Sequence, residues 1–99
     1  MRRQYFAHYY KRFGNTYSLL YADTKEELEM IPEDAERITR KKAESLAADE
    51  NYRRKYDRSC SGYADNMIYP VGLSREDVWN ICNNSKYYKN GYVWEKASR

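Results

Sequence analysis

Hydrophobic and polar positions in the first 22 residues follow the pattern of two β-strands. Residues 4–13 hold five Tyr and Phe side chains and neither Gly nor Pro, which is typical of a strand. Gly14-Asn15 follows as a two-residue turn, and residues 16–22 predict the returning strand. The pattern therefore predicts an N-terminal β-hairpin.

A two-residue turn also fixes the register of this hairpin. Phe13 would pair with Thr16, and the earlier pairs would follow in step. One face then has the larger apolar area, and we expect it to be covered by the rest of the domain. That face holds Phe6, Tyr10, Leu19 and Tyr21.

Two short segments carry the spacing of a helix-capping box. In residues 23–32, Thr24 precedes Glu27 by three positions, and Pro32 ends the helix. Ser74 and Asp77 repeat the spacing at the start of a later helix. The apolar face of that later helix is formed by Val78, Trp79, Ile81 and Cys82, so we expect Cys82 to lie in the core.

A longer helix is predicted between these two segments. Thr39 caps it, and the periodicity extends it from Arg40 to about Tyr56 with a thin apolar stripe. The stripe holds Ala43, Leu46 and Ala47. Short strands are expected on either side of this helix, over residues 35–39 at a sheet edge and over residues 67–69 before Pro70.

The C-terminal segment carries the strongest turn signal of the chain. Asn90-Gly91 separates residues 86–89 from residues 92–95 and predicts a second β-hairpin. We find no repeat, linker or low-complexity tract. The sequence thus predicts one α+β domain over residues 1–99, with an N-terminal hairpin, about three helices and a C-terminal hairpin.

Composition changes this picture by showing what the core must be made of. The 99 residues include only 14 Leu, Ile, Val and Phe, but they include 12 Tyr. A net charge of +3 argues against a disordered chain. Because each Tyr can bury on the order of 150–250 Å², we expect a folded domain whose core is partly tyrosine, with the hydroxyls at its rim.

Several classes of protein are excluded by what the sequence lacks. It has no apolar run that could cross a membrane, and no apolar segment follows the basic N-terminus, so we expect a cytoplasmic protein. His8, Cys60 and Cys82 are too few to fill a zinc site. The glycines are isolated, so no phosphate-binding loop is present. We therefore expect no metal, no cofactor, no catalytic residues and no enzymatic activity.

Charge is segregated along the chain. Residues 1–22 have a net charge of +4, residues 23–36 have seven acidic side chains against one Lys, and residues 37–58 have eight basic against four acidic. Such alternation differs from that of a uniformly basic nucleic-acid binder. It favours oppositely charged faces that dock specifically or associate head to tail, and a homodimer is one outcome that we leave open.

The basic residues suggest one type of binding site. Long cationic side chains beside aromatic rings can follow a phosphate backbone while the rings stack on bases. The alternative is a solvated helix face that pairs with nearby acids. The candidate nucleic-acid-binding residues are Arg53, Arg54, Lys55, Arg58, Tyr52 and Tyr56, preceded by a first basic group of Arg37, Arg40, Lys41 and Lys42.

The acidic segment and the aromatic hairpin suggest a second type of binding site, for a protein partner. Acidic side chains of the first helix can approach a basic groove of a partner, and tyrosines supply buried anchors. The alternatives are helix capping for the acids and core packing for the tyrosines. The candidate partner-binding residues are Glu26, Glu27, Glu29, Tyr9, Tyr10 and Tyr17.

The stretch YFAHYYKRFGNTYSLLYADTKEELEMIPEDAERITRKKAESL, from Tyr5 to Leu46, resembles small orphan proteins of phages and other mobile elements. Anti-CRISPR proteins are the best-known class of these. The resemblance is one of style and carries over no residue roles. It implies a non-enzymatic inhibitor that sterically blocks a bacterial protein or ribonucleoprotein complex that processes nucleic acid.

Two other functions compete with this hypothesis. The first is a domain that binds RNA or DNA directly through the basic residues and tyrosines, with affinity that falls steeply with salt. The second is a toxin-type ribonuclease that works with Tyr, Arg and Lys. The sequence leaves open whether the target is protein or nucleic acid, and what His8, Cys60 and Cys82 do.

Overall fold

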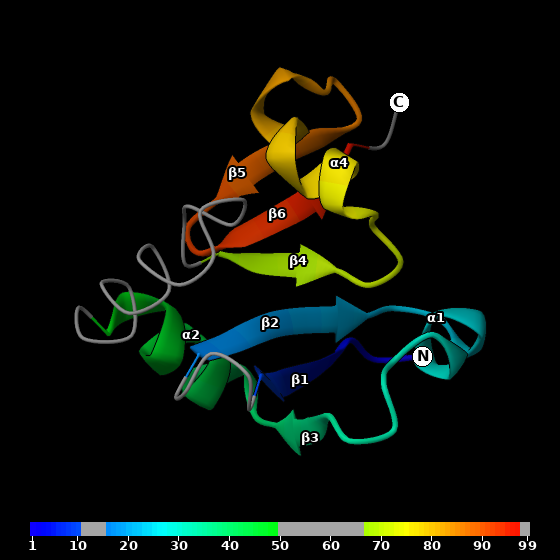
Figure 1. Ribbon diagram of the computed structural model, residues 1–99, viewed down its shortest axis with the longest axis vertical. Coiled ribbons are helices and arrows are strands. Elements are labelled where there is room, and N and C mark those ends of the chain that lie inside the picture. Colours follow the sequence, from blue (N-terminus) through cyan, green and yellow to red (C-terminus); the bar gives the residue numbers. More distant parts are fainter. Residues whose placement is uncertain (11–15, 50–66, 98–99) are drawn as a thin grey trace.

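The computed structural model describes residues 1–10, 16–49 and 67–97. These residues form one six-stranded sheet, three α-helices and a 3₁₀ helix, which together make an α+β fold (Figure 1). The predicted fold class is confirmed. Within the described residues, the order of helices and strands is also the predicted one.

The sheet joins two hairpins through a single short strand, in the order β3-β1-β2-β4-β6-β5. β1 (Gln4–Tyr10) and β2 (Thr16–Ala22) form the first hairpin, and β5 (Tyr87–Asn90) and β6 (Val93–Lys96) form the second. β4 (Ile68–Pro70) lies between them and pairs in parallel with both β2 and β6. β3 (Glu36–Ile38) pairs with β1 at one edge, as predicted.

The register of the first hairpin differs from the predicted one. Thr16 pairs with Tyr10 rather than with Phe13, a shift of three positions, and Tyr5 pairs with Tyr21. An odd shift exchanges the faces of one strand relative to the other. Phe6 therefore lies on the face opposite to Leu19 and Tyr21, so the expectation of one covered face shared by Phe6, Tyr10, Leu19 and Tyr21 is wrong.

The cause of this error is that both faces of the sheet are covered. On one face, α2 (Arg40–Ala48) packs Ala43 and Ala47 against a cluster formed by Tyr5, Ala7, Leu19, Tyr21, Ile68 and Val93. On the other, α4 (Arg75–Trp79) and the 3₁₀ helix η2 (Ile81–Asn83) contribute Val78 and Ile81 to a cluster with Met67, Tyr69 and Trp94 (Figure 1). Because each face of the described sheet carries a buried cluster, a simple alternation of apolar and polar residues does not mark the register in the sequence.

Local capping fixes where the helices begin. Thr24, Thr39 and Ser74 are the N-caps of α1 (Lys25–Glu29), α2 and α4, and each side chain accepts a hydrogen bond from a backbone N–H three positions later. The capping box of α4 is complete. In α1 the carboxylate of Glu27 instead accepts from the backbone N–H of Asp23, at 2.7 Å.

α2 is shorter than its sequence pattern predicts. It ends at Ala48, and Asp49 is extended, so the prediction of one helix from Arg40 to about Tyr56 is wrong. Only Ala43 and Ala47 are buried in it, and these small side chains give the packing support for about two turns. Residues 50–66 lie outside the described part of the chain.

Three other expectations need correction. Cys82 is exposed in η2 and does not lie in the core. Tyr21 is fully buried, and its hydroxyl donates to the carbonyl oxygen of Trp94 at 2.7 Å rather than lying at a rim. In the second hairpin Asn90 pairs with Val93, so the central turn residues are Gly91-Tyr92. The φ of Gly91 is +62°, which is strained for any other residue.

Candidate functional site

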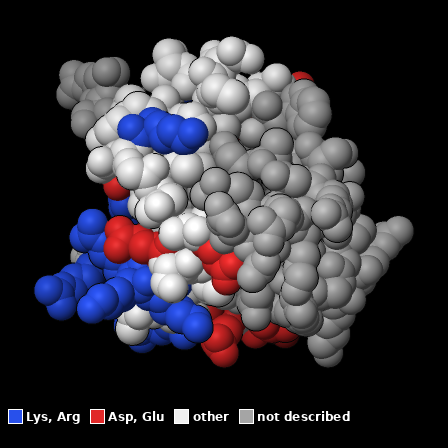
Figure 2. All heavy atoms as spheres, turned by 90° about the vertical axis from the view of Figure 1, so that its left-hand side faces the viewer, with Lys and Arg blue, Asp and Glu red and all other residues white. Residues whose placement is uncertain are grey.

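Four exposed basic side chains gather where β3 leads into α2. They are Arg37 in β3 and Arg40, Lys41 and Lys42 in the first turn of α2, and we call them the basic surface. Figure 2 shows Lys and Arg side chains gathered in the lower part of this side of the molecule, with acidic side chains among them. The second predicted basic group, Tyr52 to Arg58, lies outside the described residues.

The position of these cations in α2 is unfavourable for the helix itself. The first turn of a helix carries a partial positive charge, so it is stabilised by acids and destabilised by bases. α1 and α4 follow this rule with two acids each in the first turn, whereas the first turn of α2 has none and carries three bases. Residues that break a local rule without helping the fold are candidates for function.

One of the four has a salt-bridge partner within the helix. Arg40 Nε lies 3.5 Å from Glu44 Oε2, one turn later, and the Arg40 side chain is 72% exposed. Such exposed pairs contribute only about 0.3–0.5 kcal/mol, so Arg40 can exchange this partner for another anion. Within the described part of the chain, no other salt bridge involves the basic surface.

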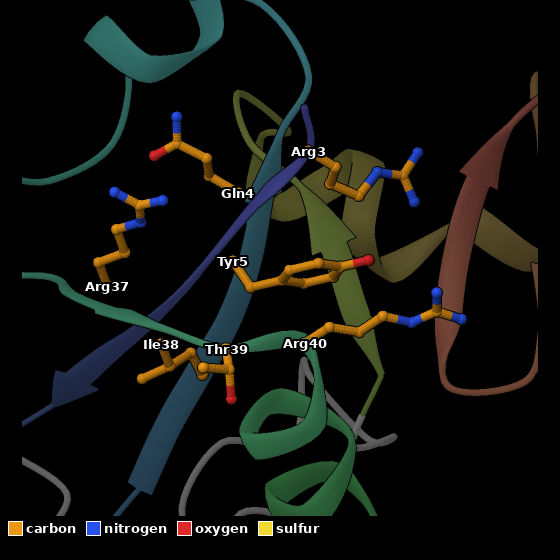
Figure 3. A pocket seen from close by; sticks show the side chains of 7 residues that line it. All are labelled: Arg3, Gln4, Tyr5, Arg37, Ile38, Thr39 and Arg40. Carbon is orange, nitrogen blue, oxygen red and sulfur yellow. The ribbon is translucent and has the colours of Figure 1, made fainter. Parts of the chain in front are cut away.

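A cavity of about 490 Å³ adjoins the basic surface. It lies where the start of β1 meets the end of β3 and the start of α2 (Figure 3). The ring of Tyr5 lies between the side chains of Arg3 and Arg40, and its hydroxyl points to the same side as their guanidinium groups (Figure 3). The lining residues are Arg3, Gln4, Tyr5, Arg37, Ile38, Thr39 and Arg40.

Arg3, at one side of the cavity, belongs to an ionic cluster on the α2 side of the sheet. Its guanidinium group donates two hydrogen bonds to Asp23, at 2.7 and 3.1 Å, and two to Glu95, both at 2.7 Å. It also stacks 3.9 Å from the ring centre of Tyr21. A further ion pair joins Lys96 to Glu27. The ionic cluster is thus Arg3, Asp23, Glu27, Glu95 and Lys96.

The electrostatics of the ionic cluster show that its charges are used within the fold. The hydrogen bond donated to Glu95 raises the pKa of Arg3 and outweighs the opposite effect of burial. Burial alone would raise the pKa of Glu27. The hydrogen bonds from Lys96 and from the backbone of Asp23 together have the larger opposite effect, so the pKa of Glu27 lies below its ordinary value. Burial raises the pKa of Tyr21. The positive charge of Arg3 is therefore already compensated by two carboxylates. Binding of an anion in the cavity would depend on the other cations that line it.

The predicted acidic site is divided by the structure. Glu26 and Glu29 are exposed on α1, whereas the carboxylate of Glu27 is engaged by Lys96 and by Asp23. The backbones of Tyr9, Tyr10 and Tyr17 lie in β1 and β2, but their side chains are outside the described part. Glu26 and Glu29, with the exposed Glu33 and Asp34, form what we call the acidic surface.

The remaining candidates do not form a reactive group in the described residues. His8 Nε2 lies 3.1 Å from Asp34 Oδ1, Cys82 is exposed, and Cys60 is outside the described residues. Over residues 1–10, 16–49 and 67–97, no group of three His, Cys, Asp or Glu side chains is placed to hold a metal ion. No helix of this part is both long and apolar enough to cross a membrane.

The cavity and the ionic cluster are the parts of this region that sequence reasoning missed. Arg3 directly precedes β1, Tyr5 lies in β1, and Arg37 and Arg40 lie in β3 and α2. No motif in the sequence connects these residues. The basic residues at the start of α2 were the one available signal. In comparisons with known proteins, no protein-family model, no curated protein and no solved structure matches this chain.

Proposed function

We propose that this chain is a small non-enzymatic binding protein whose basic surface binds the phosphate backbone of RNA or DNA. The observation that supports this function is the first turn of α2, which carries three exposed cations. Their charge is unfavourable at this end of the helix dipole. Arg37, exposed on the neighbouring strand β3, adds a fourth cation whose side chain points away from that of Arg40 (Figure 3). These charges do not stabilise the helix that carries them, and phosphate groups would compensate them.

Phosphate binding has a physical signature that distinguishes it from most protein docking. Each neutralised phosphate releases counterions, so the logarithm of the affinity falls with the logarithm of salt by roughly 0.7–0.9 per contact. Contacts from all four residues of the basic surface would give a slope of roughly three to four. Direct readout of base sequence is not needed for this binding.

The test is a salt titration of oligonucleotide binding, read by fluorescence anisotropy. We expect the full chain to bind a single-stranded oligonucleotide and the double variant Lys41→Glu/Lys42→Glu to bind much more weakly. The slope should fall by roughly 1.4–1.8, because two phosphate contacts are lost. The matched control is Lys25→Glu/Lys86→Glu, which makes the same charge change at exposed lysines on other parts of the molecule.

The control separates a specific surface from net charge. If both double variants lose the same affinity, the protein binds by its overall charge and the basic surface has no special role. If the wild-type protein does not bind, or its affinity is independent of salt, nucleic-acid binding is refuted. The variants should keep the helical circular-dichroism signal of the wild type, since all four side chains are exposed.

A second candidate function is supported by the acidic surface. Residues 5–46 resemble, in style, small orphan proteins of phages and mobile elements, of which anti-CRISPR proteins are the best-known class. Exposed acidic side chains can occupy the basic nucleic-acid groove of a bacterial complex. Glu26 and Glu29 are exposed and available for such docking. In a pull-down from bacterial lysate, a stoichiometric protein that survives nuclease and is lost with Glu26→Lys/Glu29→Lys would favour this inhibitor over the nucleic-acid binder.

A further inference from the structure

The cavity beside the basic surface is lined by a tyrosine whose ring is buried in the core. Tyr5 is 9% exposed, and its ring packs in the cluster under α2. Tyr5 lines the cavity, and the hydrogen bonds between described side chains do not include its hydroxyl. The comparison is Tyr21, the cross-strand neighbour of Tyr5, whose buried hydroxyl is bonded to Trp94.

A hydroxyl that bonds to no described side chain can donate its hydrogen to a ligand that enters the cavity. The Tyr5 hydroxyl points to the side on which the Arg40 guanidinium group lies (Figure 3). Among the described residues, Arg40 pairs with Glu44 alone, through an exposed contact. A phenolic donor beside a guanidinium group suits a phosphate oxygen, because both groups donate and one supplies charge.

The size of the cavity selects among phosphate-bearing ligands. Its volume of about 490 Å³ lies within the roughly 300–1,000 Å³ of pockets that hold small organic molecules. An inorganic phosphate ion would leave most of it empty. A carboxylate side chain of an acidic peptide would leave it similarly underfilled. A nucleotide, with its sugar and base, fits this range.

We propose that the cavity is a subsite for one nucleotide of the bound strand, whose phosphate accepts a hydrogen bond from the Tyr5 hydroxyl and pairs with Arg40. This proposal rests on the proposed function and specifies where a single nucleotide is held. Arg3 bonds to both Asp23 and Glu95 and offsets part of their negative charge, so Arg40 supplies the positive charge that pairs with the phosphate. Arg37 lies on the other side of β1 (Figure 3). It would contact the bound nucleic acid beyond the subsite.

The test compares Tyr5→Phe with Tyr88→Phe, which removes an equivalent hydroxyl from an exposed residue of β5. The probes are a single-stranded oligonucleotide, a nucleoside 5′-monophosphate as competitor, inorganic phosphate and an acidic peptide. We expect Tyr5→Phe to lower the affinity for the oligonucleotide and the nucleotide roughly tenfold, the effect of one hydrogen bond to a charged group. Tyr88→Phe should have no effect, and Arg40→Gln should weaken the same two ligands.

The urea midpoint of Tyr5→Phe should equal or exceed that of the wild type, because the ring is kept and the lost hydroxyl bonds to nothing described. Wild-type affinity in Tyr5→Phe overturns the proposal. So does displacement of the oligonucleotide by inorganic phosphate or by the acidic peptide as effectively as by the nucleotide. If oligonucleotide binding depends on salt and requires Lys41 and Lys42 but not Tyr5, the subsite is overturned and the proposed function is retained. If the nucleotide binds through Tyr5 but the oligonucleotide does not bind, the proposed function is overturned and the nucleotide site is retained.

Discussion

The guanidinium group of Arg3 is held from two sides by carboxylates that come from distant parts of the chain. Asp23 follows β2 and Glu95 lies in β6, and both lie close to the ring of Tyr21. A planar fork can bond two carboxylates at once, which a Lys ammonium group cannot do with the same geometry. At the scale of single residues, the ionic cluster ties the start of the sheet to its last strand.

Glu27 allows this cluster to be tested by pH. Its folded-state pKa lies below the ordinary value of 4.5, so its ionised form stabilises the fold above that value, and the contribution is lost as pH falls through the folded pKa. We expect Glu27→Gln to lower the free energy of unfolding by about 1 kcal/mol near neutral pH. The difference from wild type should shrink toward zero in acid, measured by urea unfolding at a series of pH values.

Glu26→Gln is the matched control for this experiment. Glu26 is the preceding residue of α1, and it is exposed. Its substitution should leave the urea midpoint nearly unchanged across the same pH range, since surface changes of this kind are small. A Glu27→Gln effect that persists undiminished in acid would show that Glu27 acts through packing and not through its charge.

The helices show how a local signal sets an element and how function can oppose it. Thr39 caps α2, with its hydroxyl 3.1 Å from the backbone nitrogen of Lys42, but the bases that follow it oppose the helix dipole. The cap and the buried Ala43 and Ala47 hold the helix in spite of these bases. Stability and binding should therefore respond in opposite directions to a charge change in this turn.

Lys42→Glu tests that opposition. An acid in the first turn interacts favourably with the dipole, so the free energy of unfolding should rise by about 1 kcal/mol, while the affinity for an oligonucleotide falls. The stability is measured by urea unfolding and the affinity by anisotropy. Lys86→Glu, an exposed lysine outside the helices, should change neither by as much. A stability that falls in Lys42→Glu would mean that Lys42 supports the fold.

Structural features that depend on residues close together in the sequence were predictable. Features that depend on contacts between distant parts of the chain were not. The three N-caps and both hairpins follow from residues within a few positions, and they are confirmed. The register of β1 with β2 depends on which side chains α2 covers, and the end of α2 depends on where its packing stops. The bonds of Arg3 to Glu95 join residues at opposite ends of the chain, and no local pattern announces them.

At the scale of the molecule, the described sheet is held together through β4. Ile68 is fully buried, pairs with Leu19 of one hairpin and Val93 of the other, and packs under α2. We expect Ile68→Ala to lower the free energy of unfolding by about 2–5 kcal/mol. Ile38→Ala, in the half-buried edge strand β3, should cost clearly less, both measured by urea unfolding. Equal losses would mean that β4 is not the central link.

The position of β4 also orders the events by which this chain can fold. Each hairpin brings together residues that are near in sequence, so it can form early and on its own. β4 must instead find partners in both hairpins across long stretches of chain, and the entropy of closing those loops must be lost before any contact is gained. The strand that joins the two halves is thus the slowest to be placed, and until it docks each hairpin exposes an unpaired edge to other copies of the chain.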